Sequence, residues 1–285
     1  MRIADAHQHF WDPRVNYHPW LCDEPQVPFR YGDYSALRRP YLPADYLADA
    51  GQHAVVKTVY VETEWDPSDP LGETAWVERL RRETGFPTVM VAQARLDRDD
   101  AASVLERQAA ISFVHGIRHK PAPGAMRDLR WRAGYARLAR LGLRFDLQVA
   151  WTELADAAAL CVAFPDTQLV LNHAGLPADR SAAGIAGWKR ALCLLAQCPN
   201  AAIKISGIGV PGTRWTPECN REVVLSAIEI FGVRRAMFAS NFPVDRLCAS
   251  FDEIYSGFRE IVKDFSALEQ RALFHDNAVR IYAME

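Results

Sequence analysis

Short runs rich in β-branched and apolar residues alternate with amphipathic segments from one end of the chain to the other. Such alternation predicts parallel strands joined by crossover helices. Eight runs fit this description, and they cover residues 2–9, 55–62, 88–94, 113–119, 144–149, 168–173, 201–206 and 236–241. After the first run the repeat averages about 30 residues, which is the length of one βα unit.

The segments between the runs carry helical signals. Two of them show apolar stripes at helical spacing, formed by Trp131, Tyr135, Leu138 and Leu141 and by Val223, Val224, Ala227, Ile228 and Phe231. Three carry helix start signals, which are Thr216 before Pro217, Asp69 before Pro70, and the capping-box pair Ser266 and Glu269 that opens the final helix.

Eight strand and helix units in 285 residues predict an α/β fold of one domain, a single (β/α)8 barrel of the TIM type over residues 1–285. A doubly wound open sheet is the main alternative. That fold would need a glycine-rich phosphate turn after its first strand, whereas the first run here ends in His-Gln-His.

One segment, residues 10–43, interrupts the repeat. It has six prolines, no regular period and a high density of aromatic residues, among them Trp11, Tyr17, Trp20, Phe29 and Tyr31. Because a loop this long inside a compact domain is usually functional, we expect it to cover the C-terminal mouth of the barrel and to line the substrate site, with Trp11 among the residues that contact substrate. A packing arm or a subunit contact is the alternative.

Composition narrows the class of protein. The chain is 49% hydrophobic and 24% charged, as in water-soluble globular proteins. Its net charge of −2, from 33 basic and 35 acidic residues, argues against nucleic acid or an anionic membrane as a partner. With no long apolar stretch and no secretion-signal pattern, the protein is expected to be cytoplasmic. Its partner is then a small-molecule substrate, and a homo-oligomer remains open.

The strongest chemical signal lies in the first run, Ile3-Ala4-Asp5-Ala6-His7-Gln8-His9. Side chains alternate faces along a strand, so Asp5, His7 and His9 are expected to share one face. Two imidazoles on one face can converge on a single ion or substrate group. A carboxylate one layer below can hold an imidazole N–H and select its tautomer.

Two later runs end in further polar residues. His173 follows the apolar residues of LVLNHAG, and Asn241 ends the run that continues as MFASNFPVD. Both side chains are expected at the C-terminal rim. A neutral amide binds divalent metals weakly and cannot act as a base near pH 7, so a base would have to come from elsewhere. Asp245 is the nearest carboxylate that could supply it.

Taken in order, these motifs resemble the amidohydrolase superfamily, and within it the amidohydrolase-2 branch of sugar-lactone and pyrone-dicarboxylate lactone hydrolases. The resemblance is carried by DAHQHFWDP at the start, NHAG around His173, GIRH at 116–119, KISG at 204–207, and SNFPVD where the family commonly has S-D-W-P. It covers nearly the whole chain, and the ordered set is far more specific than any one motif.

The resemblance implies a distorted barrel that adds water to a lactone carbonyl, with His7, His9 and His173 in the site and a strand-eight aspartate as metal ligand and proton shuttle. This chain departs at that last position, where Asn241 stands. It also lacks a lysine in the fourth or fifth run that could bridge two metals, so a binuclear centre is not expected. One Zn²⁺ bound by His7, His9 and His173 and a metal-independent site both remain open.

Other residues at run ends are candidate substrate contacts. Arg118 and His119 point to opposite faces, and the arginine would suit a carboxylate or an oxyanion. The remaining candidates are Glu62, Gln148, Lys204 and Ser206.

The leading function is therefore a lactone hydrolase of carbohydrate metabolism. A metal-dependent decarboxylase of the same branch and a barrel whose site has become a binding module are the alternatives.

Overall fold

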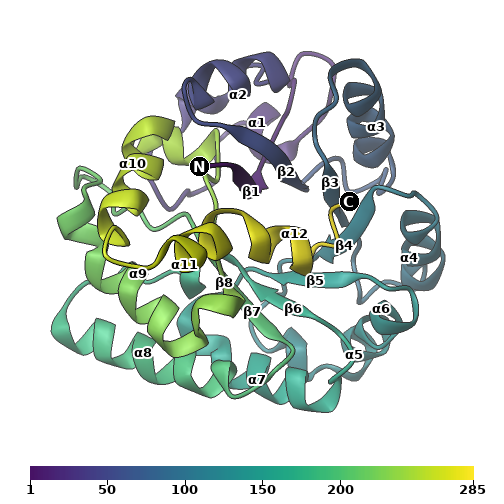
Figure 1. Cartoon of the computed structure of the whole chain (residues 1–285). Helices are drawn as coiled ribbons and strands as arrows, with labels where there is room; N and C mark the ends of the chain where they lie inside the picture. The colour runs from purple at the N-terminus through teal and green to yellow at the C-terminus, as the bar shows by residue number, and fades with distance from the viewer.

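Eight parallel strands form a barrel in which each strand pairs with the next along the chain, in the order β1 to β8 (Figure 1). The computed structural model describes residues 1–285. The strands are β1 Ile3–Gln8, β2 Val55–Val61, β3 Val89–Gln93, β4 Val114–Arg118, β5 Arg144–Leu147, β6 Leu169–Leu171, β7 Ala201–Ile205 and β8 Ala236–Phe238. Each strand lies inside one of the eight runs read from the sequence, so the predicted barrel is confirmed.

The barrel closes between β1 and β8 through residues just beyond the end of β8. The backbone N–H of His9 donates to the carbonyl of Phe242 at 2.8 Å, and that of Asn241 donates to the carbonyl of His7 at 2.8 Å. This closure brings the C-terminal end of the first strand directly against the turn after the last one.

Helices surround the barrel and connect successive strands (Figure 1). They are α1 Pro19–Cys22, α2 Pro43–Ala50, α3 Gly72–Thr84, α4 Ala101–Ala109, α5 Leu129–Tyr135, α6 Arg137–Arg140, α7 Leu154–Ala163, α8 Ala182–Ala196, α9 Pro217–Phe231, α10 Phe251–Ile261, α11 Ala267–Arg271 and α12 Asn277–Ile281. Short 3₁₀ turns occupy Ser35–Leu37, Ala125–Arg127, Trp151–Glu153, Asn172–Gly175, Val233–Arg235 and Val244–Leu247, and one π turn occupies Ala272–Asp276.

Two of the three helix starts lie where the sequence places them. Thr216 accepts a hydrogen bond from the N–H of Cys219 at the start of α9, and Ser266 and Glu269 form the capping box of α11. The third helix begins later than predicted. Asp69 accepts from the N–H of Gly72 at 3.0 Å, so α3 starts at Gly72 and Pro70 precedes it.

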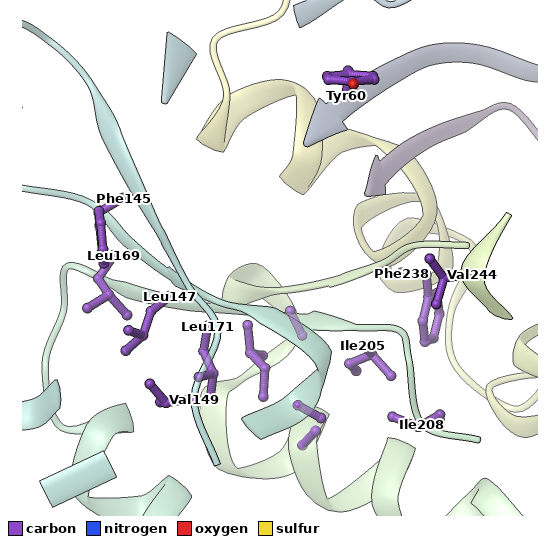
Figure 2. Packing of buried hydrophobic residues seen from close by; sticks show 14 of the residues in the cluster. Tyr60, Phe145, Leu147, Val149, Leu169, Leu171, Ile205, Ile208, Phe238 and Val244 are labelled. Atoms are coloured by element: carbon purple, nitrogen blue, oxygen red, sulfur yellow. The ribbon is translucent and has the colours of Figure 1, made fainter. Parts of the chain in front are cut away.

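Two apolar clusters hold the fold together. The larger, with 64 residues, lies between the strands and the surrounding helices; Figure 2 shows part of it, including Phe145, Leu169 and Phe238. The smaller has 14 residues, among them Ala4 and Ala6 of β1, and it also contains Ile281, Tyr282 and Met284. The C-terminal segment therefore packs on the opposite side of the strands from the larger cluster and fills the bottom of the barrel.

None of the helices combines the length and the apolar character that a membrane span requires. All six cysteines are free thiols.

Candidate active site

A cavity of about 330 Å³ opens at the C-terminal ends of the strands. Six of the candidate site residues proposed from the sequence line it, namely His9, Trp11, Arg118, Gln148, His173 and Asn241. Residues 27–30 and Trp20, all from the segment 10–43, supply another part of the wall. The volume suits one small ligand.

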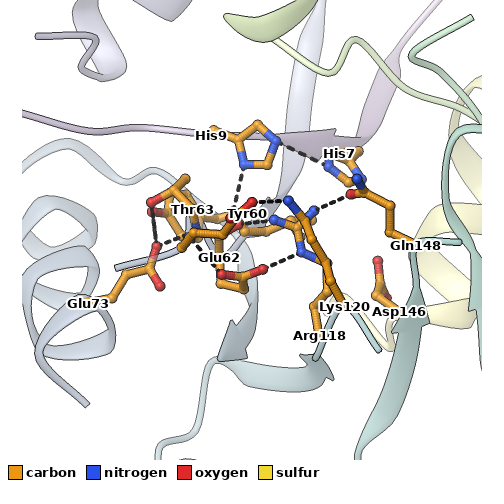
Figure 3. A network of polar contacts seen from close by, with 12 residues as sticks. His7, His9, Tyr60, Glu62, Thr63, Glu73, Arg118, Lys120, Asp146 and Gln148 are labelled. Carbon is orange, nitrogen blue, oxygen red and sulfur yellow. Dashed lines mark hydrogen bonds and ion pairs between the residues drawn. The ribbon is translucent and has the colours of Figure 1, made fainter. Parts of the chain in front are cut away.

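His7 of β1 and His9, which follows β1 directly, lie next to each other, and His9 lines the cavity. The Nε2 atoms of His7 and His9 lie 3.2 Å apart, and Nδ1 of His9 lies 2.7 Å from the carbonyl oxygen of Val61 (Figure 3). Because a carbonyl only accepts, the Nδ1 of His9 carries the proton and its Nε2 carries the lone pair. His7 can then donate its Nε2–H to His9, while Nδ1 of His7 has no partner.

Asn241 places its amide beside the same atom. Its Oδ1 lies 3.4 Å from Nε2 of His9, and its Nδ2 donates to Oδ1 of Asp245 at 2.6 Å. A carboxylate accepts only, so this bond determines which end of the amide faces His9. Two acceptors, the His9 nitrogen and the Asn241 oxygen, therefore lie side by side without a hydrogen bond between them.

His173 stands next to this group with its backbone in the left-handed region, at φ 54°. Its ring centroid is 4.6 Å from that of His7, and its Nδ1 lies 3.0 Å from Oγ of Ser206. Gly207 makes room for the imidazole, because a Cβ at that position would lie 2.6 Å from Nδ1 of His173. A strained backbone next to a cavity is a frequent feature of functional sites.

The three imidazoles are neutral at ordinary pH. Burial holds the pKa of His7, His9 and His173 well below the usual value of a histidine, and nearby cations lower it further. The cations that lower these pKa values most are Lys204 for His7, Arg118 for His9 and Arg30 for His173. Neutral imidazoles are the form that accepts protons and binds metals.

Arg118 and Glu62 form a buried ion pair at the side of the cavity (Figure 3). The guanidinium donates Nε–H to the Glu62 carboxylate, Nη2–H to the Glu62 carbonyl, and Nη1–H to Oε1 of Gln148 at 3.1 Å. Three of the five N–H groups of a guanidinium are thus engaged, and two remain for a substrate. Glu62 does not line the cavity but holds Arg118 in place.

Asp5 does not lie where the sequence predicts. Asp5 accepts hydrogen bonds from Tyr46 of α2, from Ser240 and from the backbone N–H of His7, so it does not share the face of the imidazoles or hold an imidazole N–H. The cause is an irregular register between β1 and β2 from Asp5 to Gln8, which interrupts the alternation of side chains.

His119 and Lys204 also lie away from the cavity. Nδ1 of His119 accepts from Nε1 of Trp131 at 3.1 Å and from the N–H of Leu96 at 3.2 Å, because the side chain after Arg118 points outward to α5. Lys204 is fully buried and pairs with Asp146 at 2.6 Å. It therefore acts as a fixed positive charge below the site and does not contact substrate.

Trp11 and Asp245 have structural connections that the sequence does not show. Nε1 of Trp11 donates to the carbonyls of Leu37 and Arg39, so this residue ties segment 10–43 together while it faces the cavity. Asp245 lies behind Asn241, does not line the cavity and is 1% exposed. Burial raises its pKa.

Sequence reasoning missed Arg30 and named Tyr31 only as one of the aromatic residues of segment 10–43, and both approach the site from that segment. Arg30 lines the cavity, its Nη2 is 3.6 Å from Oδ1 of Asp245, and its Nη1 is buried without a partner. The Tyr31 hydroxyl donates to Asp245 at 3.0 Å. Lys120 and Glu64, also missed, form an ion pair at the cavity wall. No periodic pattern marks Arg30 and Tyr31, because an irregular loop has no repeat that points a side chain inward.

The donor set can be compared with what a metal needs. No group of three or more His, Cys, Asp or Glu side chains converges on one point. The pair of His7 and His9, however, fits one ion: nitrogens bound to a tetrahedral zinc lie about 3.3 Å apart, and theirs lie 3.2 Å apart. The Asn241 oxygen, 3.4 Å from His9, completes a partial set of three donors.

Comparisons with known proteins show which family the chain is similar to. The protein-family model described as Amidohydrolase matches residues 4–284. The chain is 41% identical over 292 residues to the uncharacterised protein y4mH of Sinorhizobium fredii, with 98% of each chain covered. It is 30% identical over 298 residues to the L-fucono-1,5-lactonase of Burkholderia multivorans, covering 98% of this chain and 95% of the relative.

A solved structure is also similar over the whole length. The crystal structure of an amidohydrolase from Burkholderia multivorans with bound zinc has a TM-score of 0.84 at 28% identity, with 100% of both chains covered.

Proposed function

This chain belongs to the amidohydrolase family, in the branch with lactonase-like members, and from that membership and the geometry of the cavity we propose that it hydrolyses small lactones. The substrate class is a sugar lactone of the kind named in its relative, L-fucono-1,5-lactone. Such a reaction belongs to carbohydrate metabolism.

One observation carries the proposal. Two neutral imidazoles, those of His9 and His173, and the Arg118 cation line a single cavity that has room for one small ligand. Hydrolysis of a lactone needs a group that accepts a proton from water and a positive group near the carbonyl oxygen, where negative charge develops. The site offers both within one enclosed space.

We assign proton transfer to His173. When its Nδ1–H donates to Ser206, Nε2 holds the lone pair and can accept a proton. As the water oxygen attacks the lactone carbonyl carbon, the water proton passes to His173 and the carbonyl electron pair moves onto oxygen. When that pair returns, the bond from the carbonyl carbon to the ring oxygen breaks, and the ring oxygen takes the proton from His173. The product is an open-chain hydroxy acid.

Arg118 stabilises the charge that develops on the carbonyl oxygen, since Glu62 and Gln148 hold its guanidinium rigidly with two N–H groups left for substrate. Segment 10–43 closes the other side of the cavity through Trp11 and Arg30 and restricts access of bulk water.

His7, His9 and Asn241 would hold one divalent ion, for which zinc fits the nitrogen spacing. When bound, the ion supplies Lewis-acid polarisation of the carbonyl. His173 is assigned to proton transfer because Ser206 bonds its Nδ1 and leaves its Nε2 free to accept a proton, and because no three His, Cys, Asp or Glu side chains converge on one ion.

The experiment is a panel of aldonolactones, with L-fucono-1,5-lactone first, in weak buffer with a pH indicator that reports acid release. Assays with and without added Zn²⁺ use wild type, His173→Gln, and His275→Gln as a matched control outside the cavity. We expect acid release above the spontaneous rate for wild type and the control, and a loss of at least about 10² in kcat/KM for His173→Gln. If no lactone is hydrolysed faster than the background by folded wild type under either condition, the proposed function is wrong.

A further inference from the structure

Asp245 is a buried carboxylate that does not line the cavity. It contacts Asn241, which does. We propose that Asp245 is a positioning residue that orients and polarises the amide of Asn241, so that the two side chains together act as one anionic acceptor beside the lone pair of His9. The inference rests on the proposed function only where lactone hydrolysis is measured. Its main test is Zn²⁺ affinity, which needs no turnover.

The orientation follows from what each group can donate. The Asn241 amide has an N–H end and an oxygen end, and Asp245 accepts the N–H end at 2.6 Å. The oxygen must then face His9, where it lies 3.4 Å from Nε2. Without Asp245, either end of the amide could turn to His9. The N–H end would donate to the lone pair of His9, which would then no longer be available to a cation or a substrate hydroxyl.

The polarisation follows from charge. A hydrogen bond from an amide N–H to a carboxylate is charge-assisted and draws the amide toward its dipolar form. The Asn241 oxygen becomes more negative as a result. The Asp245 carboxylate thus supplies, through the amide, part of the negative charge that an aspartate at position 241 would supply directly. Its own charge stays outside the cavity.

Several contacts fix Asp245 itself. It accepts from the N–H of Gly207 at 2.9 Å and from the Tyr31 hydroxyl at 3.0 Å, and Arg30 lies 3.6 Å away. The N–H of Asp245 donates to the carbonyl of Asn241 at 3.1 Å, so one turn holds the two residues together. With both oxygens occupied and the side chain sealed from the cavity, Asp245 acts through Asn241 and not as the base.

This arrangement has a consequence for substitution. Asn241→Asp alone would place two carboxylates in contact, and like charges at that distance cannot both ionise. Exchanging the two side chains, as Asn241→Asp with Asp245→Asn, instead lets the new amide donate to the new carboxylate and leaves a carboxylate oxygen facing His9.

The test measures Zn²⁺ affinity by competition with a chelator, together with the visible spectrum of the Co²⁺-loaded protein. Asp245→Asn replaces a carboxylate that accepts from the Asn241 amide by a neutral amide that can also donate to it. This change should weaken Zn²⁺ binding at least about tenfold. The exchanged double variant should bind Zn²⁺ at least as tightly as wild type, and Asn241→Asp alone should bind less tightly than the double variant. Asp156→Asn, a matched loss of a carboxylate that pairs with exposed Arg127, should leave Zn²⁺ affinity unchanged.

Melting temperatures show whether each variant folds, and the exchanged variant keeps the test valid if Asp245→Asn is unstable. The inference is overturned if folded Asp245→Asn keeps wild-type Zn²⁺ affinity, if the exchange fails to restore it, or if wild type binds no Zn²⁺. Restored Zn²⁺ affinity without lactone hydrolysis in any variant would instead refute the proposed function alone.

Discussion

The Nε2 atoms of His7 and His9 lie 3.2 Å apart. The backbone positions of two such residues, two apart on a strand, are separated by about 7 Å. The rings therefore converge toward each other. The irregular register of β1 allows this, and the hydrogen bond from His9 to the carbonyl of Val61 directs the lone pair of His9 toward His7. Two residues of one short motif thus lie together at the site, with His9 lining the cavity and His7 directly beside His9.

The first prediction concerns this pair. His9→Gln removes the nitrogen that faces both His7 and Asn241, and we expect kcat/KM for lactones to fall at least about 10²-fold while the melting temperature changes little. His275→Gln serves as the control, since that histidine lies in the π turn Ala272–Asp276. Turnover near the wild-type value in His9→Gln would show that the pair has no catalytic role.

The second prediction concerns pH. Burial lowers the pKa of His9 and His173 below 6.5, so both stay neutral where an ordinary histidine is already protonated. We expect kcat/KM to hold its plateau down through pH 6.5 and to fall only below it. A pH profile with stable buffers measures this. A half-loss of activity at or above pH 6.5 would mean that these imidazoles are not the groups that must be neutral.

The third prediction concerns Glu73, which lies behind the cavity wall. Its Oε1 accepts from the Tyr60 hydroxyl at 2.8 Å and from the N–H of Thr63 at 2.7 Å, while Oε2 has no partner (Figure 3). Burial and the nearby Glu62 charge raise the pKa of Glu73 to about 7. A raised folded pKa stabilises the fold below the unfolded pKa of the group, and that stability is lost as pH rises toward 7.

Glu73→Gln copies the protonated acid at every pH. The free energy of unfolding of the variant relative to wild type should therefore increase between pH 5 and pH 8, by about 1–3 kcal/mol. Urea denaturation at several pH values measures it. Glu78→Gln on the same helix, α3, removes a surface carboxylate paired with Arg82 and should show no such trend. A difference that does not depend on pH would contradict the assignment.

The fourth prediction concerns Gly207. Its φ is +58°, and an added Cβ would lie 2.6 Å from Nδ1 of His173 and 2.7 Å from Nη2 of Arg30. Gly207→Ala should therefore displace both side chains and reduce kcat/KM at least about tenfold, in addition to the cost of about 1 kcal/mol for alanine in this backbone region.

Gly212→Ala provides the matched control. Gly212 also has a positive φ, of +70°, but an added Cβ there would meet nothing within 4 Å. We expect it to lose a similar amount of stability from the backbone and to keep its activity. Equal activity losses in the two variants would show that the contact with His173 is unimportant.

Much of the fold could be predicted from the sequence because it depends on local patterns that repeat. Each βα unit contains its own apolar strand and its own amphipathic helix, and eight such units have one common way to bury their apolar faces. Strand ends were predictable for the same reason. A residue such as His173 or Arg118, placed just after an apolar run, lies at the C-terminal rim of the barrel whatever the loops do.

The tertiary structure decided what local pattern could not. The irregular register between Asp5 and Gln8 separated Asp5, which bonds Tyr46, from the face of the imidazoles. The burial of Lys204 beside Asp146 removed that lysine from the cavity. Arg30 and Tyr31 reach Asp245 across more than 200 residues of chain, from a segment without any period. Contacts of this kind depend on which surfaces meet when the barrel closes. A period of 2 or 3.6 residues describes which side chains share a face of one element, and it contains no information about the partner that the face will meet.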